Sequence, residues 1–246
     1  MTVAAPAKSE RELFEANLAF YEGLWSGTKL IGPERFNTWP LVCDLVKSAT
    51  RRLEVAPGLR PRLPIADTYF ADISTAALSQ LSRRGGHVSL ASVMSLPYDD
   101  DSFDLVAALD IIEHVDDDSR ALTELSRVAA PGAAVLIAVP LHPEKWIAFD
   151  DFVGHCRRYT PDELLTKLAT HGFTIEQSAG YGMQPKSSKL LDVGMWFLTH
   201  RREHALWCYN HLFMPLGLKF EKKLQLVPGL IDLQSIDEVL LVCRRA

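Results

Sequence analysis

Short apolar runs alternate with helical segments from residue 51 onward, and this alternation constrains the fold more than any other feature of the chain. The expected strands cover residues 51–56, 68–71, 87–90, 104–109, 133–140, 173–177 and 238–243. The run at 133–140 is apolar throughout, as expected of a strand that is buried on both faces of a parallel sheet. We therefore expect an α/β fold with a doubly wound, mostly parallel, seven-stranded sheet.

Helices are expected between these strands at residues 74–83, 117–129 and 160–171. Ser74 is the expected N-cap of the first, because a serine hydroxyl accepts hydrogen bonds from the free N–H groups of a first helical turn. Thr160 caps the third helix in the same way, with Glu163 at the capping-box position. Pro131 and Gly132 are expected to end the second helix.

Two further stretches, one before the first strand and one before the last, are helical in pattern and rich in aromatic residues. We expect residues 1–49 to form an N-terminal helical lid. Residues 50–246 then form the main domain, with a helical insertion at residues 186–230. Aromatic series of this kind also occur as ordinary core packing.

The charge of the chain argues against a nucleic acid as its main partner. The net charge is −5, whereas binding to a phosphate backbone depends on clustered lysine and arginine. No stretch reaches about 18 consecutive apolar residues and no signal-peptide pattern begins the chain, so we expect a soluble, cytoplasmic protein without a transmembrane segment. Four cysteines lack CxxC spacing, which indicates neither a zinc cluster nor a disulfide framework: Cys43, Cys156, Cys208 and Cys243.

The most informative spacing joins the turn after the first strand to the acid that ends the second. The turn reads Glu-Val-Ala-Pro-Gly from Glu54 to Gly58, and Asp72 lies 18 positions after Glu54. In a βαβ nucleotide fold the first turn lets the backbone approach a ligand, and an acid about 20 residues on accepts hydrogen bonds from ribose hydroxyls. Asp72 is therefore the expected ribose ligand. Alternatively, it caps the next helix beside Ser74.

Six short motifs follow one another between residues 53 and 159. They are Leu-Glu-Val-Ala-Pro-Gly (53–58), Ala-Asp-Ile-Ser (71–74), Ser-Leu-Pro-Tyr-Asp-Asp-Asp-Ser-Phe-Asp-Leu-Val (95–106), Asp-Ile-Ile-Glu-His-Val (110–115), Arg-Val-Ala-Ala-Pro-Gly-Ala (127–133) and Gly-His-Cys-Arg-Arg-Tyr (154–159). In this order they resemble the class I S-adenosylmethionine-dependent methyltransferase family, particularly a small-molecule subgroup with Leu-Pro-Tyr, Ser-Phe-Asp and Glu-His-Val signatures. The resemblance covers about residues 50–180. It implies a Rossmann-like fold that binds S-adenosyl-L-methionine.

The resemblance also implies a cofactor role for each matching position. These positions are Glu54, Ala56, Gly58, Asp72, Ile73, Ser92, Val93, Leu109 and Asp110. Ser92 and Val93 would flank the adenine, and Asp110 would lie beneath the sulfonium and amino-acid end. Alternatively, Glu54 pairs with an arginine such as Arg51, and the apolar residues of the set belong to the core.

Two departures from the family pattern bear on the cofactor. The family usually has two or three glycines in the first turn, but here only Gly58 is present, beside Pro57. The family also usually has an acid or asparagine where Ser92 stands, so Ser92 or a backbone carbonyl would recognise the adenine. A turn so poor in N–H groups argues against NAD, whose pyrophosphate needs several such donors, and favours a cofactor without phosphate.

His155 is the expected catalytic base, because an imidazole accepts a proton near neutral pH with little change in its pKa. Methyl transfer from a sulfonium otherwise needs only alignment and exclusion of water. In the alternative reading the same segment is a structural latch, in which Asp150 pairs with Arg157 or Arg158. Glu113 and His114 are half of a metal site at most, without a further ligand at the usual spacing, so no metal is expected.

The expected contacts with the methyl acceptor are His114, Arg157, Arg158, Tyr159, Tyr21 and Trp25. In the family the insertion before the last strand commonly contributes to the acceptor pocket, and its apolar surplus here indicates a small apolar acceptor. A helical cover or a homodimer interface explains that surplus equally well. We therefore expect methyl transfer to a small apolar molecule. The alternative is a methyltransferase-like protein that has lost catalysis and serves as a binding or scaffold partner, because its first turn has a single glycine.

Overall fold

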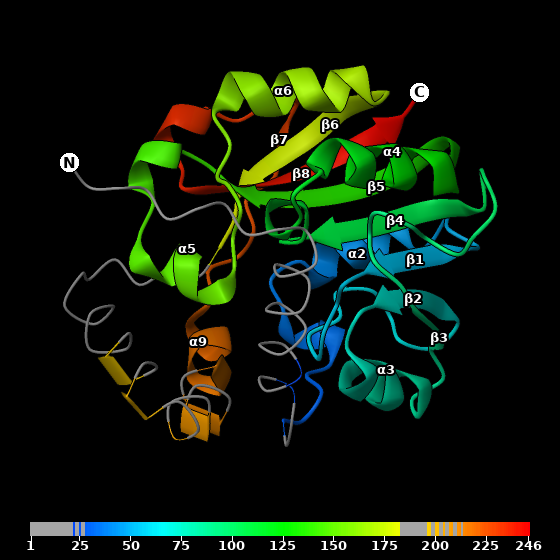
Figure 1. Cartoon of the computed structure of the whole chain (residues 1–246). Coiled ribbons are helices and arrows are strands. Elements are labelled where there is room, and N and C mark those ends of the chain that lie inside the picture. The colour runs from blue at the N-terminus through cyan, green and yellow to red at the C-terminus, as the bar shows by residue number, and fades with distance from the viewer. Residues whose placement is uncertain are drawn as a thin grey trace.

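The computed structural model describes residues 28–182 and 214–246, together with single residues among 22–25 and 196–212. Its centre is one mixed sheet (Figure 1) with the strand order β3-β2-β1-β4-β5-β8-β6-β7. Strands β1 to β5 run parallel to one another, and β8 is antiparallel to both β5 and β6. The strands are β1 (Arg52–Val55), β2 (Thr68–Asp72), β3 (His87–Leu90), β4 (Phe103–Leu109), β5 (Ala129–Pro140), β6 (Phe173–Gly180), β7 (Val227–Pro228) and β8 (Glu238–Arg245).

The sheet therefore has eight strands where the sequence predicted seven. The additional strand, β7, has two residues and pairs antiparallel with β6 at the outer edge of the sheet. Pro228 has no N–H group to donate to a ladder, which confines such a residue to an edge. Each of the seven expected strands coincides with an observed one, so the Rossmann-like, mostly parallel architecture is confirmed.

The second helix ends within one residue of the expected position, but Pro131 and Gly132 are not what ends it. Helix α4 (Asp118–Val128) ends before Pro131, because Ala129 already takes an extended conformation and pairs with Phe103 of β4. Pro131 and Gly132 thus lie within β5.

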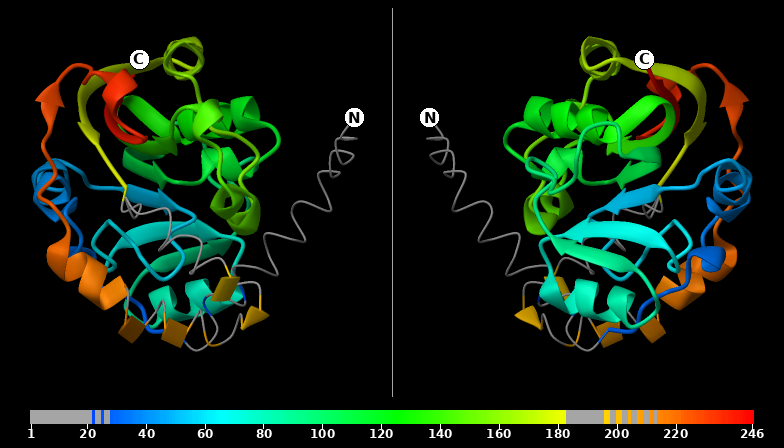
Figure 2. Two further views of the ribbon diagram at one scale, coloured as in Figure 1. Left: turned by 90° about the vertical axis from the view of Figure 1, so that its left-hand side faces the viewer. Right: turned by 90° about the vertical axis from the view of Figure 1, so that its right-hand side faces the viewer.

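Helices cover both faces of the sheet, and Figure 2 shows α2 (Trp39–Leu45) and α4 on opposite sides of it. The alternation of β5 explains its unbroken apolar run. Val135 and Ile137 pack in one core with Leu122 of α4, whereas Leu136 packs in the other with Val42 of α2. The remaining helices are α3 (Thr75–Ser82), α5 (Ala148–Val153), α6 (Pro161–Thr170) and α9 (Met214–Phe220), with the short 3₁₀ turns η1 (Pro33–Arg35), η2 (Ile112–His114), η3 (Pro143–Lys145) and η5 (Leu233–Ser235).

The two expected helical additions are only partly described. In the N-terminal one, η1 and α2 are present, and in the insertion α9 is a helix, as expected. Residues 221–230 contain no helix, so the insertion is not helical to its end. Much of both segments lies outside the described residues. None of the helices that the structure describes is long and apolar enough to cross a membrane.

The cap of α3 offers a direct test of this local structure. The Ser74 hydroxyl accepts a hydrogen bond from the backbone N–H of Ala77 at 3.2 Å, as the sequence predicted. Replacing Ser74 by alanine leaves that N–H without its acceptor, so the free energy of unfolding should fall by about 1 kcal/mol in urea titrations. Ser79→Ala, an exposed change within the same helix, is the control and should leave stability nearly unchanged.

Candidate functional site

The order of the strands places a ligand site between β1 and β4. From β1 the chain proceeds outward to β2 and β3, and from β4 it proceeds in the other direction to β5. Ligands of open α/β sheets bind at such a reversal, outside the carboxyl ends of the strands. Both strands end there in left-handed backbone, with φ of 54° at Ala56 and 53° at Asp110. This conformation costs on the order of 1–2 kcal/mol for a residue other than glycine.

Glu54 fixes the course of the turn after β1. Its buried carboxylate accepts hydrogen bonds from the backbone N–H groups of Arg62 at 2.8 Å and Leu63 at 2.9 Å. Arg51, the alternative partner considered for Glu54, instead holds its guanidinium over the rings of Tyr69 and Phe103. Glu54 therefore shapes the turn from within the protein.

Asp72 joins the ends of β1 and β2. Its carboxylate accepts hydrogen bonds from the backbone N–H groups of Gly58 at 2.9 Å and Ser74 at 2.8 Å. Burial raises the pKa of Asp72, and these backbone hydrogen bonds oppose that effect. Ser74 takes the N-cap position that the alternative reading gave to Asp72. A carboxylate has about four lone-pair sites, so Asp72 keeps capacity for a further donor.

The residues expected around the adenine lie in two different environments. Ile73 and Ser92 are half-buried, and the backbone N–H of Ala91 donates to the carbonyl of Asp72, which brings the two segments together. Val93 is buried in the same core cluster as Leu53, so its side chain packs inside the protein. Leu109 packs against the core on the other face of the sheet.

A group of polar side chains that the sequence did not connect gathers at the end of β4. Asp110 shares a hydrogen bond with Glu238 at the start of β8, and its carboxylate is attracted to the Arg62 guanidinium. Arg62 donates to the Tyr181 hydroxyl at 3.2 Å and lies over the Phe36 ring. Among the described residues, Oδ1 of Asp110 is buried and has no hydrogen-bond partner. A buried acceptor of this kind is usually satisfied by something, which suits a ligand.

The buried Glu54 makes stability depend on pH. Burial raises the pKa of Glu54 to about 7, although the N–H groups of Leu63 and Arg62 oppose it. Because the pKa in the folded state exceeds that of the unfolded chain, the contribution of Glu54 to stability is complete below about pH 4.5. It is lost as the pH rises through 7, and the loss is on the order of 3 kcal/mol.

Glu54→Gln isolates this contribution, because the amide does not titrate. The difference in unfolding free energy between wild type and variant should change between pH 4.5 and 7.5 in favour of the variant, as measured by urea titration at each pH. The exposed Ser79→Ala variant, which removes no titratable group, should give a difference that does not change with pH. Parallel curves for wild type and Glu54→Gln would contradict the assignment.

A buried ion pair holds the segment that follows β5. Arg158 donates to the two carboxylate oxygens of Asp150 at 2.9 and 2.8 Å, and both side chains are buried. Nδ1 of His155 lies 2.8 Å from the same carboxylate. Burial raises the pKa of Asp150, but the hydrogen bonds from His155 and Arg158 outweigh it and lower the pKa to about 2. The latch considered from the sequence therefore exists, with Arg158 as the partner.

Three of the expected acceptor contacts are used inside the protein instead. Tyr159 is fully buried, and its hydroxyl donates to Asp118 at 2.8 Å. Arg157 also pairs with Asp118, at 2.8 Å, rather than with Asp150. Buried side chains with complete partners have no surface for an acceptor, so Tyr159 and Arg158 are corrected to structural residues.

Of the two aromatic residues expected to contact the acceptor from the N-terminal segment, the structure describes Trp25. Trp25 is buried, and its indole packs directly over Gly58, so it covers the first turn. Tyr21 lies outside the described residues.

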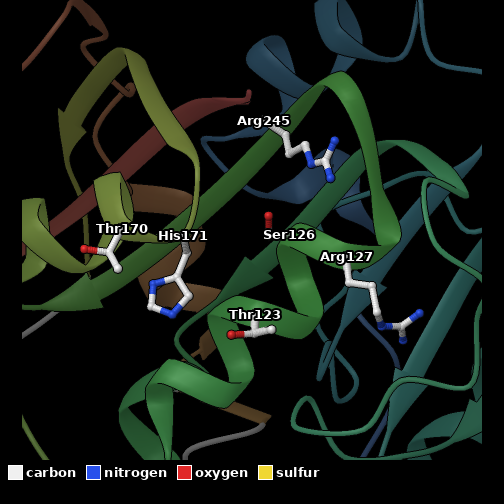
Figure 3. Close-up of a pocket in the computed structure, with 6 residues that line it drawn as sticks. All are labelled: Thr123, Ser126, Arg127, Thr170, His171 and Arg245. Carbon is white, nitrogen blue, oxygen red and sulfur yellow. The ribbon is translucent and has the colours of Figure 1, made fainter.

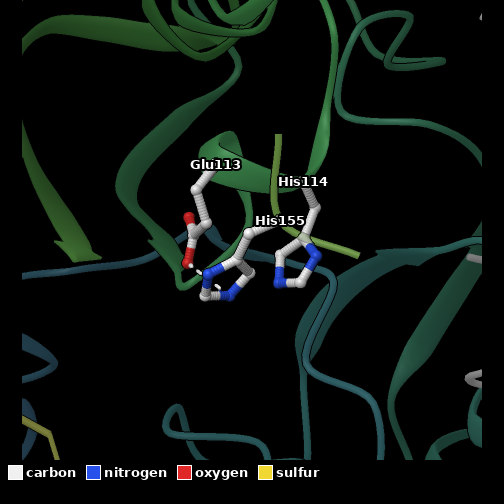
Figure 4. A group of neighbouring side chains, drawn as sticks. All are labelled: Glu113, His114 and His155. Carbon is white, nitrogen blue, oxygen red and sulfur yellow. Dashed lines mark ion pairs between the residues drawn. The ribbon is translucent and has the colours of Figure 1, made fainter. Parts of the chain in front are cut away.

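Glu113, His114 and His155 converge near the end of β4 (Figure 4). The first two belong to η2, and the third follows α5; the backbone N–H of Cys156 donates to the carbonyl of Glu113 and ties the segments together. Burial, and next the charge of His155, lower the pKa of His114 to about 3. Burial, and next the charge of Asp110, raise the pKa of Glu113 well above its ordinary value.

A hollow of about 350 Å³ lies at the end of the sheet opposite to the carboxyl ends of the parallel strands (Figure 3). Its lining residues are Thr123, Ser126, Arg127, Thr170, His171 and Arg245. The backbone of Arg127 bonds to Asp101 just before β4 begins, which places the hollow away from the carboxyl ends. The Arg127 guanidinium is already paired with Glu124 and Asp100. The fold gives no reason to seek the ligand here.

Residues 54–137 match the family described as a methyltransferase domain. Norajmaline N-methyltransferase of Rauvolfia serpentina is 43% identical over 53 residues, which are 22% of this chain and 18% of that protein. Across five curated relatives the matched segments span between 18% and 44% of the relative's own length. All five are named as methyltransferases.

Two solved structures have a similar fold over nearly the whole length of this chain. A protein of Thermotoga maritima, described as an S-adenosylmethionine-dependent methyltransferase and possible histamine N-methyltransferase, has a TM-score of 0.57 at 15% identity and covers 96% of this chain and 94% of its own. The cyclase SpnF has a TM-score of 0.59 at 17% identity, with 98% and 97% covered. At such identities the likeness shows a shared fold and no more.

Proposed function

We propose that this chain, whose residues 54–137 match a methyltransferase domain, transfers a methyl group from S-adenosyl-L-methionine to a small, apolar acceptor. The observation that carries the proposal is the position of Asp72. Its buried carboxylate stands at the carboxyl end of β2, beside the strand reversal, and keeps acceptor capacity for a ribose hydroxyl of the cofactor.

The donor set of the turn suits a cofactor without phosphate. Pro57 has no N–H, and the N–H of Gly58 is already bonded to Asp72. A pyrophosphate would therefore find few donors, whereas a sulfonium and an ammonium group need acceptors. Asp110, with its buried unsatisfied oxygen, supplies one at the end of β4. When bound, the cofactor supplies an activated methyl group, and the protein has to align the acceptor and exclude water.

His155 is the group that we propose acts on the acceptor. Asp150 holds Nδ1 at 2.8 Å, so the imidazole is fixed in orientation and Nε2 is directed away from the ion pair, toward Glu113. A histidine oriented by a carboxylate in this way is suited to receive a proton at its other nitrogen.

The apolar character of the acceptor is proposed from the insertion. Among its described residues, large apolar side chains are about half exposed: Trp196, Trp207, Leu212 and Leu216. A contiguous exposed apolar surface marks a binding or contact site, and we propose that these side chains contribute to one. An apolar acceptor would cover them.

Calorimetry with S-adenosylhomocysteine tests the cofactor, and acceptor screening with a methyl-transfer readout tests the reaction. We expect binding of one molecule per chain. A folded protein that does not bind would instead support the second candidate, a methyltransferase-like binding or scaffold protein. That candidate is favoured by one observation, which is that both oxygens of Asp72 already accept backbone hydrogen bonds.

A further inference from the structure

Three side chains that carry metal-binding atoms meet at one point of the fold. From this geometry we propose that Glu113, His114 and His155 bind a divalent transition-metal ion. One ligand atom from each residue lies within 4.8 Å of the other two (Figure 4). A cation with bonds of about 2.0–2.2 Å draws such atoms to roughly 3–4 Å from one another. Small side-chain rotations are therefore enough to close the site.

No metal was expected from the sequence, because Glu113 and His114 are adjacent and have no third ligand at the usual spacing. The fold supplies that ligand. The rings of His114 and His155 lie 4.6 Å apart at 80°, and Nε2 of His155 is 4.0 Å from the Glu113 carboxylate.

The orientation of His155 is that of a metal ligand. Its Nδ1 is bonded to the buried Asp150 carboxylate, which is itself held by Arg158. Metal-binding histidines nearly always bond their second nitrogen to a carboxylate or carbonyl in this manner, which fixes the tautomer and directs the other nitrogen at the ion. The same arrangement also stabilises the ring against rotation when the site is empty.

Glu113 provides an independent observation. Its side chain is 1% exposed, and Oε2 has no hydrogen-bond partner among the described residues. A carboxylate oxygen buried in this way is unfavourable unless it is satisfied. A cation between Glu113 and the two imidazoles would satisfy it.

The chemistry of the three ligands selects the kind of ion. Two imidazole nitrogens and one carboxylate favour zinc, cobalt, manganese or iron over the all-oxygen sites of magnesium and calcium. Three protein ligands leave a position open, as in catalytic rather than structural zinc sites.

The catalytic consequence, unlike the site itself, rests on the proposed function. An acceptor hydroxyl bound at the open position would lose its proton to solvent more readily, because a cation lowers the pKa of a coordinated oxygen. The ion would then replace direct proton transfer to His155, since Nε2 has a single lone pair. The acceptor would accordingly carry a hydroxyl beside its apolar part.

Cobalt titration tests the site. The full-length protein, freed of metal with a chelator, should bind one Co²⁺ per chain and develop the visible absorption of a nitrogen- and oxygen-ligated cobalt ion. His155→Ala and Glu113→Gln should each weaken cobalt binding at least about tenfold. His87→Ala, which removes an exposed histidine on β3, is the matched control and should bind as wild type does.

A tenfold excess of Mg²⁺ should leave the cobalt spectrum unchanged. Disappearance of the cobalt absorption on addition of Mg²⁺ would contradict the assignment of two imidazole ligands. Cobalt binding that is absent, or that is equal in all three variants, would overturn the proposal. Calorimetry with S-adenosylhomocysteine on the same samples keeps the two hypotheses apart. A protein that binds S-adenosylhomocysteine but fails to bind cobalt would refute only the metal site. A protein that binds cobalt but fails to bind S-adenosylhomocysteine would refute only the proposed cofactor.

Discussion

Asp72→Asn is expected to weaken binding of S-adenosylhomocysteine by about 10- to 100-fold while the protein stays folded. Hydrogen bonds from ribose hydroxyls to a carboxylate are charge-assisted and contribute roughly 1.5–3 kcal/mol, and each 1.4 kcal/mol is a factor of ten in affinity. Asparagine keeps the shape of the side chain but has one carbonyl oxygen in place of two charged ones. Titration calorimetry measures the change directly.

Asp104→Asn is the matched control for this experiment. The Asp104 carboxylate also accepts backbone N–H groups, from Thr50 at 2.8 Å and Arg51 at 2.9 Å, but it lies at the start of β4 on the opposite edge of the sheet. Its replacement should lower stability without changing the affinity for the nucleoside. Equal affinities in wild type and Asp72→Asn would show that Asp72 serves only the turn.

Asp150→Asn should lower the free energy of unfolding by about 3–5 kcal/mol. The change leaves the Arg158 guanidinium buried without its counter-charge, and breaking one side of a buried pair is far more harmful than never having formed it. Urea titration or thermal unfolding at neutral pH measures the loss. Asp151→Asn, an exposed change in the same helix, should shift stability by less than about 0.5 kcal/mol.

The same variant has a pH signature. Because the pKa of Asp150 is lowered to about 2 in the folded protein, its contribution is complete above about pH 4 and is lost as the pH falls toward 2. The gap in stability between wild type and Asp150→Asn should therefore narrow in acid. A gap that stays constant from pH 7 to pH 3 would mean that the carboxylate is not ionised in the folded state.

The parts of the fold that depend on near neighbours could be predicted from the sequence. The caps Ser74 and Thr160 act on N–H groups three residues away, and the apolar run of β5 reflects burial on both faces. The end of α4 could not be predicted in this way. Ala129 leaves the helix because it pairs with Phe103 of another strand, and no local pattern contains that pairing.

The candidate site likewise contains residues that a local spacing predicts and residues whose position depends on contacts between distant segments. The position of Asp72 follows from a spacing within one βαβ unit, so the sequence indicated it. The contact of Asp110 with Glu238 depends on β8 running antiparallel, which carries the first residue of that strand to the carboxyl edge of the others. The one signal in the sequence for this contact was the acidic residue Glu238 at the start of the last expected strand. His155 approaches Glu113 only through the path of the segment after β5.

The first turn tolerates replacement at one position and not at another. Ala56 has a φ of 54°, which glycine adopts freely and alanine, asparagine or aspartate can adopt, whereas β-branched residues would be strained. Gly58 shares that angle, but a Cβ there would also collide with the Trp25 indole. Steric contact thus explains why the turn has a glycine at position 58 and needs none at position 56. Sequence divergence can proceed at position 56 while position 58 stays closed to every other amino acid for as long as Trp25 covers it.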